Sequence, residues 1–378
     1  MDFSFSEAQE DVADLTRQIL EGKLSEERMR QVEAGVDRFD RDLWDELARA
    51  DILGIALPTD VGGSGYGMVE QMRVLIELGR HVAPVPVLPS IVLGAMSITA
   101  FGSATQTQDW AVPAASGRVV LSAALSEDLN PTPNAPVTRA ERSGAGWRIT
   151  GTKTTVPAGP IADLILVPAA SDEGMTVFLV RPDDDGARLD RQQIVDKDAE
   201  AILRLDAVEL PGDRVLGGVG QGSDIYAFME RHAVVGLCSL QVGVCERAVE
   251  MTAAYSKERV QFERPIASFQ AVGQRLADAY IDVEAIRLTT LQAAWRLAEG
   301  LPCDAEIETA KFWAADAGHR VAHTAVHIHG GVGIDVDHPA HRYFVAAKRN
   351  EFALGGATTH LRRLGRWLAA DPAGPLPL

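Results

Sequence analysis

The last third of the chain contains the feature that most limits how it can fold, four long stretches with helical periodicity. From about Ser223 onward, apolar residues recur at the three- and four-residue spacing of an amphipathic helix. The stretches cover Tyr226–Tyr255, Phe269–Ala298, Cys303–His329 and Ala340–Ala369. Short connections between long helices favour neighbours that run in opposite directions. The sequence therefore predicts an antiparallel four-helix bundle.

The middle of the chain has a different pattern, made of short apolar or alternating runs. Gly, Pro and Asp separate these runs, which is typical of strands joined by turns. The runs cover Val119–Leu125, Trp147–Thr150, Asp163–Pro168, Thr176–Val180 and Ile202–Val208. No helix of useful length fits between them. An antiparallel sandwich or barrel is therefore favoured over a parallel sheet with crossover helices.

The first hundred residues are predicted to be mainly helical. Ser6 followed by Gln9 matches a capping box, and further helices are predicted over Arg41–Ala50 and from Met68 to about Val82. The order of helices, strands and helices indicates an α+β chain of several domains, which agrees with a length of 378 residues. We place an N-terminal α-helical domain at residues 1–111, a middle β-sandwich or barrel at 112–220, the four-helix bundle at 221–370 and a disordered tail at 371–378.

Charge and cysteine content limit the partners of the chain. A formal net charge of −17 and a pI near 5.0 argue against nucleic acid or an anionic membrane surface. Cys238, Cys245 and Cys303 show no CxxC spacing, and we interpret them as packing thiols in a reducing compartment. The N-terminal sequence has no apolar signal-peptide core, and no apolar run reaches about 18 residues. We therefore expect a cytoplasmic protein with no membrane partner.

Two short runs have the composition of a cofactor site. The first, Tyr255–Ala271, reads YSKERVQFERPIASFQA, and the second, His327–Gly333, reads HIHGGVG. Arg259 supplies a fixed cation with a planar fork of donors that suits a pyrophosphate, and Phe262 adds a flat apolar face. The glycines of the second run permit close backbone approach and positive φ, as an anion or ring cradle requires. Taken alone, each run is also compatible with a solvated helix end or a plain turn.

Together the two runs resemble a known family. The pattern ER-x-QF-x-RPI, followed by FQAV and LAD and later by HGG-x-G, resembles the C-terminal domain of the acyl-CoA dehydrogenases. LGIALPTDVGGSGYG near the N-terminus and GWRITGTKTTVPAGPIADLILV in the middle extend the resemblance. It implies helical, β and four-helix-bundle domains in that order, with FAD as a cofactor that this half-site shares with the neighbouring subunit. The residues that the resemblance assigns to cofactor binding are Arg259, Gln261, Phe262, Gln270, His327, Gly330 and Gly331.

The resemblance implies α,β-dehydrogenation of an acyl-CoA, in which a Glu removes the α-proton while a hydride passes to the flavin. The family places this Glu at one of two positions. The first, in a Tyr-Glu-Gly-Thr turn fifteen residues beyond Pro339, falls on Leu354. The second, on the first bundle helix 22 residues before Tyr255, falls on Ala233. Neither side chain accepts a proton, so we predict no catalytic residue, with Glu230 one turn earlier as the fallback base.

The middle domain departs from the family in the loops that hold the flavin ring. The family's TEP-x-AGSD loop is replaced by ALSEDLNP, from Ala124 to Pro131. In the second loop, Thr155 stands where the family has a Trp. We infer that the chain has lost its own ring-binding face as well as its base.

These matched losses predict a non-catalytic subunit. The chain resembles the base-less partner in the α2β2 acyl-CoA dehydrogenases that actinobacteria use on steroid side-chain CoA thioesters, as in cholesterol catabolism. The partner chain would supply the Glu and the ring-binding sheet, an acyl-CoA would be the substrate, and an electron-transfer flavoprotein would be the acceptor. Two alternatives stay open: a homomeric dehydrogenase with Glu230 as base, and a non-redox acyl-CoA-binding or scaffold protein.

Three histidines recur at intervals of four and would share one face of a helix. They are His319, His323 and His327. Although HxxxH can hold zinc, no HExxH and no cysteine partner accompanies it. We therefore expect structural roles and no metal site, with His327 at the position of the family's cofactor-binding Gln.

Overall fold

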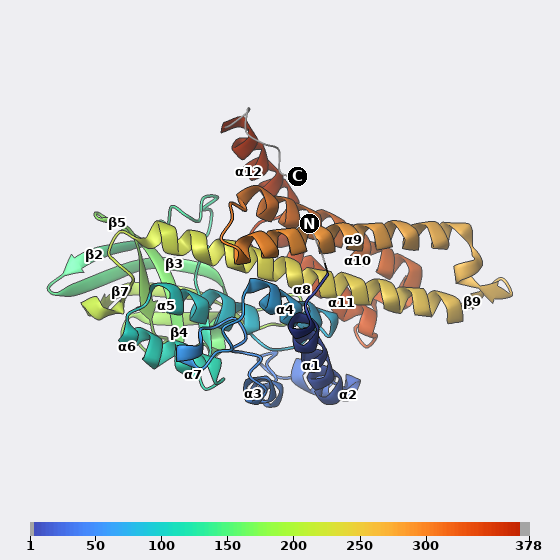
Figure 1. The fold of residues 1–378 in the computed structure, drawn as a ribbon, viewed down its shortest axis with the longest axis horizontal. Coiled ribbons are helices and arrows are strands. Elements are labelled where there is room, and N and C mark those ends of the chain that lie inside the picture. The colour runs from blue at the N-terminus through green and yellow to red at the C-terminus, as the bar shows by residue number, and fades with distance from the viewer. Residues whose placement is uncertain (1–3, 371–378) are drawn as a thin grey trace. The chain divides into compact units, whose positions relative to one another are not determined.

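The computed structural model describes residues 4–370 of the chain, whose helices and strands are shown in Figure 1. The tail predicted at 371–378 lies outside the described residues. The chain forms two compact units, of which the first comprises the segment up to Glu26, Met68–Ala83 and the chain from Val234 onward. The second comprises Glu27–Gly67 and Pro84–Ala233. The domain limits inferred from the sequence stay predictions.

The first unit is a helical bundle with one large apolar core and a separate smaller apolar cluster. Its helices are α1 (Glu7–Lys23), α4 (Met68–Arg80), the part of α8 (Gly222–Glu258) from Val234 onward, α9 (Gln270–Ala298), α10 (Asp304–His329), α11 (Pro339–Phe352) and α12 (Ala357–Ala370). The core joins buried residues of α4, α8, α9 and α10, among them Met72, Ile286 and Val321. The predicted capping box at the start of α1 is confirmed: the Ser6 hydroxyl accepts the Gln9 N–H, and the Gln9 side chain accepts the Ser6 N–H.

The prediction of a single helix over Ala340–Ala369 is wrong, because the chain forms two helices there, α11 and α12. Between them Leu354 has φ +57° and Gly355 has φ +101°, left-handed conformations that end an α-helix. The Leu354 carbonyl oxygen also lies 3.0 Å from Nε2 of His360, which holds the turn against the start of α12. Apolar periodicity continues on both sides of the turn, so the pattern alone does not reveal the break.

The second unit combines short helices with a sheet. The helices are α2 (Glu26–Glu33), α3 (Arg41–Arg49), α5 (Met96–Phe101), α6 (Ala104–Gln106) and α7 (Val112–Ala115), with π-helical turns at Leu88–Ala95 and Thr107–Ala111. Asp40 begins α3 by accepting the Leu43 N–H at 3.1 Å. No helix within residues 4–370 is both long and apolar enough to cross a membrane.

The strands of the second unit form one mixed sheet in the order β6-β7-β3-β2-β4-β5-β8, with β1 beside β4. The strands are β1 (Leu121–Ala123), β2 (Arg139–Ser143), β3 (Gly146–Pro157), β4 (Leu164–Ser171), β5 (Gly174–Val180), β6 (Ala187–Gln192), β7 (Glu200–Leu210) and β8 (Val215–Leu216). The five predicted strands are confirmed as β1, β3, β4, β5 and β7, and the expected fold class is confirmed with them. The β1–β4 and β2–β4 pairs are parallel, whereas the remaining pairs are antiparallel.

The α4 and α8 helices of the first unit touch at two glycines. A Cβ at Gly243 would lie 2.0 Å from the carbonyl oxygen of Ile76 and 2.6 Å from the amide nitrogen of Arg80. A Cβ at Gly79 would lie 2.1 Å from the carbonyl oxygen of Leu240. Because interiors are close-packed and backbone cannot yield by an ångström without loss of contact elsewhere, only glycine permits this crossing.

We expect Gly243→Ala to lower the free energy of unfolding by about 1–3 kcal/mol, because the added methyl group overlaps the α4 backbone. Gly365→Ala is the matched control: nothing lies within 4 Å of a Cβ at that helical position, and Ala is the better helix former. Urea denaturation followed by circular dichroism measures both variants. A Gly243→Ala chain as stable as the parent would contradict the close contact.

Candidate cofactor site

The run Tyr255–Ala271, predicted to bind a pyrophosphate, forms the end of α8, a two-stranded hairpin and the start of α9. The N–H of Arg259 donates to the Tyr255 carbonyl at 2.8 Å, as in a last helical turn. Strand β9 (Val260–Gln261) then pairs antiparallel with β10 (Arg264–Pro265). The two residues of the hairpin loop, Phe262 and Glu263, both have positive φ, +52° and +64°, as a type I′ turn requires. This geometry leaves Phe262 86% exposed.

A second aromatic group supports the hairpin from the side of α9. The rings of Phe262 and Phe269 meet edge to face with centroids 6.2 Å apart. The guanidinium of Arg264 lies 4.1 Å from the centre of the Phe269 ring. Helix α9 begins directly afterwards at Gln270, whose side chain is exposed. Exposed Gln261 follows Arg259 on the same hairpin, so these predicted residues lie on one short, solvent-facing segment.

A ring stack brings the two sequence runs to the same end of the bundle. The Tyr255 and His329 rings are stacked, with centroids 4.4 Å apart and 23° between their planes. The Tyr255 hydroxyl also donates to the His329 carbonyl at 3.5 Å. Arg259 is one turn beyond Tyr255, and Gly330 and Gly331 follow His329 directly. The structure therefore places the end of α8 beside the glycine turn at the end of α10.

The glycines of the turn have different roles. Nothing lies within 4 Å of a Cβ built on Gly330 or Gly331, and Gly330 has φ +65°. Both face open space, as a backbone cradle for a ligand requires. Gly333 is different, because its Cβ would lie 2.9 Å from the Val326 carbonyl oxygen, so packing against α10 explains that glycine. His327, on the last turn of α10, is exposed.

These groups fit the nucleotide half of FAD. A pyrophosphate needs a fixed cation and room for close approach to the backbone. Arg259, which forms no ion pair within residues 4–370, offers the cation, and the open space beside Gly330 and Gly331 offers the approach. The Gly330 N–H itself donates to the His327 carbonyl at the end of α10. Nδ1 of His329 lies 2.8 Å from the Ala325 carbonyl oxygen and therefore carries the proton, which leaves Nε2 as an acceptor. That Nε2 is buried with no partner among the described residues, and burial lowers the pKa of His329. A cofactor-binding role for these residues stays a prediction.

The strand-rich unit contains a buried ion pair where the first flavin-facing loop is expected. The Lys153 ammonium donates to the Glu127 carboxylate at 2.8 Å, and both side chains are almost completely buried. The same carboxylate accepts the N–H groups of Val137 at 2.6 Å and Thr138 at 2.8 Å, and the Asn130 amide at 2.9 Å. Glu127 thus ties both ends of the loop to strand β3.

The pKa values of this pair follow from burial and from the bonds between its members. Burial by itself would raise the pKa of Glu127, but hydrogen bonds from Lys153, Thr138, Val137 and Asn130 outweigh it and lower that pKa to about 2. Burial lowers the pKa of Lys153, and Glu127 opposes the change only in part. The carboxylate is therefore committed to the loop and is not available as a base.

The second flavin-facing loop also lacks the groups that hold a ring. Thr155, at the position of the family's Trp, has φ +50°, and its N–H donates to the Gln192 side chain at 3.0 Å. Ala158 also has positive φ, +54°. A threonine tied to strand β6 supplies no aromatic surface, so the residues of this unit do not fit the isoalloxazine ring.

Both family positions of the catalytic base hold apolar residues. Leu354 is half-buried and packs against the bundle core, and Ala233 is completely buried on α8. Glu230, the fallback base, is half-buried on α8, and the Tyr226 hydroxyl lies 3.5 Å from its carboxylate. This contact is compatible with a structural helix-surface carboxylate and does not single out Glu230 as a base.

Two buried polar side chains that sequence reasoning missed brace the turn at Leu354. Nζ of Lys311 donates to the Asn350 carbonyl at 2.9 Å near the end of α11, and burial lowers the pKa of Lys311 to about 8. Nδ1 of His360 lies 2.5 Å from the Glu308 carboxylate, while its Nε2 contacts the Leu354 carbonyl. The sequence shows only that Lys311 and His360 are polar residues within apolar helical runs. This pattern does not identify their hydrogen-bond partners.

The histidines at four-residue spacing contact each other and charged neighbours. The His319 and His323 rings lie 4.3 Å apart, and Nδ1 of His319 lies 3.1 Å from the Glu351 carboxylate. Lys348 contacts both His319 and Glu351. Within residues 4–370 no group of three ligating side chains is arranged to hold a metal ion.

The three cysteines are buried and form no disulfide, as packing thiols are expected to be. Burial raises the pKa of Cys238 to about 12 and that of Cys245 further. Because the thiolate is the reactive form, these two thiols are inert at neutral pH.

Two models of a known protein family match the sequence of this chain. The acyl-CoA dehydrogenase N-terminal domain matches residues 6–118, and the acyl-CoA dehydrogenase C-terminal domain matches residues 226–369. The chain therefore belongs to the acyl-CoA dehydrogenase family, whose members are FAD-dependent.

Two relatives from Mycobacterium tuberculosis cover nearly all of the chain. Acyl-CoA dehydrogenase FadE27 is 46% identical over 99% of this chain and 100% of its own length, and FadE28 is 30% identical over 97% and 98%. Among solved structures, a chain of the ChsE4–ChsE5 complex from the same organism is 46% identical, with a TM-score of 0.94 and full coverage of both chains. A chain of the Tcur3481–Tcur3483 steroid ACAD is 39% identical, with a TM-score of 0.91 over 97% and 99%.

We expect Glu127→Gln to lower the free energy of unfolding by about 3–5 kcal/mol, because Lys153 then lacks a buried counter-charge. Glu173→Gln removes a carboxylate from an exposed pair with Arg142 and should change the free energy of unfolding by less than about 1 kcal/mol.

The folded pKa of Glu127, about 2, lies below the ordinary value of 4.5. The ionised Glu127 carboxylate therefore contributes its full share to the free energy of unfolding above pH 4.5, and this contribution is lost as the pH falls toward 2.

Thermal unfolding of the parent, Glu127→Gln and Glu173→Gln chains between pH 3 and pH 7 checks both expectations. The acid-dependent loss should be smaller in Glu127→Gln, which has no carboxylate to protonate there. Equal acid sensitivity in all three chains would show that Glu127 is not the source of the acid-dependent loss of stability.

Proposed function

We propose that the chain is a non-catalytic subunit of a heteromeric FAD-dependent acyl-CoA dehydrogenase, where it completes the FAD site of a catalytic partner. The observation that carries this proposal is the contrast between two regions of the chain. Both positions for the catalytic Glu hold apolar residues, Leu354 and Ala233, whereas the nucleotide half-site at Arg259 and Gly330–Gly331 is exposed and open. An open half-site without its own base is useful to a neighbouring chain.

The dehydrogenation requires a catalytic carboxylate, which this chain lacks at both predicted positions. Removal of the α-proton of an acyl-CoA needs a base in a dry pocket, and bound FAD supplies the acceptor for the β-hydride. In the proposed assembly the partner contributes that Glu and the face that holds the ring. Arg259 and the glycine turn of this chain bind the pyrophosphate of the partner's FAD, and Phe262 packs on its adenosine. Gln261, Gln270 and His327 line the same cleft.

Exposed apolar side chains of the helical unit support association with another chain. Those on the hairpin, on α9 and on α12 are Val260, Phe262, Tyr280, Ile281, Leu288, Leu361 and Trp367. Scattered exposed apolar residues are ordinary, but a concentration of aromatic and branched side chains on one unit is typical of an interface. Two solved relatives, the ChsE4–ChsE5 complex and the Tcur3481–Tcur3483 steroid ACAD, are named as pairs of chains.

The same relatives suggest the substrate class and the assembly. The Tcur3481–Tcur3483 protein is described as a steroid ACAD, so we propose a CoA thioester of a steroid side chain as substrate. We propose an α2β2 heterotetramer, in which the absence of a second active site leaves room for a bulky acyl group. An electron-transfer flavoprotein is the acceptor we expect.

Flavin stoichiometry is the experiment that tests this proposal. Purified with its partner, a tetramer containing two copies of each chain should hold two FAD, measured by flavin absorbance against protein mass. The chain purified alone should be colourless and inert toward acyl-CoA. Four FAD per tetramer would overturn the proposal. A yellow chain that reduces a dye alone would favour the homomer with Glu230 as base, and a complex without FAD would favour a scaffold.

Arg259→Met should weaken FAD binding to the assembled protein by roughly 10- to 100-fold, because one charge-assisted hydrogen-bonding group is worth about 1.5–3 kcal/mol. Arg30→Met, which removes an exposed arginine of α2, is the matched control and should leave binding unchanged. Flavin fluorescence during titration of FAD into the deflavinated complex measures both. Equal affinity in the two variants, with assembly intact by mass, would remove Arg259 from the site.

A further inference from the structure

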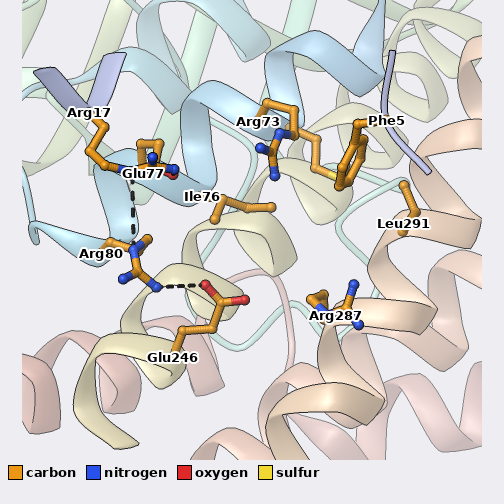
Figure 2. Close-up of a pocket in the computed structure, with 10 residues that line it drawn as sticks. Phe5, Arg17, Arg73, Ile76, Glu77, Arg80, Glu246, Arg287 and Leu291 are labelled. Atoms are coloured by element: carbon orange, nitrogen blue, oxygen red, sulfur yellow. Dashed lines mark hydrogen bonds and ion pairs between the residues drawn. The ribbon is translucent and has the colours of Figure 1, made fainter. Parts of the chain in front are cut away.

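A cavity of about 120 Å³ lies inside the helical unit, between α1, α4, α8 and α9 (Figure 2). Its lining is unusual because four arginines and two glutamates share it with an apolar wall. The charged lining residues are Arg17, Arg73, Arg80, Arg287, Glu77 and Glu246. None of them belongs to the cofactor half-site or to the positions of the catalytic base, so the cavity has no part in the function proposed above.

Two of the arginines are matched by the two lining carboxylates. Nη2 of Arg17 lies 2.7 Å from the Glu77 carboxylate, and Nη1 of Arg80 lies 2.9 Å from the Glu246 carboxylate. Glu77 is only 2% exposed, and so its charge acts on the interior of the cavity. Burial raises the pKa of Glu246, and Arg80 opposes the rise.

The other two arginines have their carboxylates outside the cavity. Arg73 pairs with Glu10, and Arg287 pairs with Glu284, each at 2.5 Å. Neither carboxylate lines the cavity, and Glu10 is 51% exposed, so water screens its charge. Nε of Arg73 is buried with no hydrogen-bond partner within residues 4–370. Figure 2 shows Arg73 of α4 and Arg287 of α9 on opposite sides of the cavity.

The cavity lining therefore combines four guanidinium groups and two carboxylates with an unused donor, Nε of Arg73. An engineered cavity of about 150 Å³ holds benzene, so a cavity slightly smaller has room for about four or five non-hydrogen atoms. Guanidinium groups bind oxyanions through paired, charge-assisted N–H donors. We propose that this cavity binds a small oxyanion, either a phosphate-sized group or a short carboxylate, between Arg73 and Arg287.

The apolar wall distinguishes the two sources of such an anion. Phe5, whose ring lies 4.2 Å from the Arg73 guanidinium, and Ile76 face the cavity beside the arginines. A short carboxylate would place its hydrocarbon part against these side chains, whereas phosphate would leave them without an apolar partner. In either case the bound anion joins α1, α4 and α9, so the ligand stabilises the folded unit by mass action.

Thermal unfolding of the full chain in its complex tests the site. Sodium phosphate, sodium propionate and sodium chloride are compared at one pH and equal ionic strength. Propionate, which like phosphate has five non-hydrogen atoms, is the carboxylate probe. Phosphate, propionate or both should raise Tm in a saturable way by a few degrees, on the order of 2–4 °C at ten times the dissociation constant, whereas chloride should not. A larger effect of propionate identifies a carboxylate site, and a larger effect of phosphate identifies a phosphate site.

Two single variants connect the effect to the cavity. Arg287→Met and Arg73→Met should each abolish most of the anion-dependent rise in Tm. Arg148→Met is the control, because Arg148 is half-exposed and pairs with exposed Glu209 in the other unit, and the rise should persist. If either variant fails to fold, NMR on the parent protein measures binding directly. Binding broadens the phosphate ³¹P signal or the propionate ¹H signals, and a second oxyanion, but not chloride, reverses the broadening.

Three outcomes overturn the proposal. The first is an equal rise in Tm in chloride, because it would show general screening. The second is a rise that never saturates, and the third is a saturable rise that survives both arginine variants. Flavin content and turnover report separately on the proposed function, so failure of either hypothesis is distinguishable from failure of the other.

Discussion

The contact between α4 and α8 is the constraint on which the helical unit depends. Gly79 and Gly243 let the two backbones approach more closely than any side chain would allow. This closeness brings Arg80 at the end of α4 within 2.9 Å of both Glu246 and Glu250 on α8. Close packing and ion pairs thus fix α8 against α4 between Leu240 and Glu250.

A fixed α8 is what positions the cofactor half-site. The helix ends where Tyr255 stacks on His329, and the hairpin with Arg259 and Phe262 begins one turn later. The glycine turn follows His329 on the other chain segment. The stack therefore fixes the two exposed segments beside each other. The precision of the half-site therefore derives from buried packing further along α8.

Sequence reasoning succeeded where local pattern determines structure, and it failed where long-range contacts do. The long helices, the five apolar strands and the Ser6 capping box follow from periodicity and capping. Strands β2 and β6 were missed because they are mostly polar. Their pairing with neighbouring strands defines them, and the sequence pattern does not show that pairing. The break at Leu354 was missed because its cause is a positive φ held by buried His360, which no local pattern encodes.

The candidate site divides in the same way. Arg259, Phe262 and the glycine turn could be predicted as a candidate site from the sequence, because ligand binding needs particular residue types at short spacing. Glu127 and Lys153 could not, because they are 26 residues apart and their pairing depends on the fold of the sheet. The cavity arginines come from three helices separated by up to 270 positions, so only the structure brings them together.

The hairpin tip gives the physical reason to expect a second chain. Phe262 has φ +52°, a conformation that costs a residue other than glycine about 1–2 kcal/mol, and its ring is 86% exposed. A folded chain on its own gains little from this arrangement, since neither the strain nor the exposed aromatic surface is offset by burial. Burial of that ring against a neighbour's nucleotide would recover about 25 cal/mol for each Å² removed from water, enough to outweigh the strain once most of the ring is covered. The tip is therefore better explained as part of an assembled site than as the surface of an isolated protein.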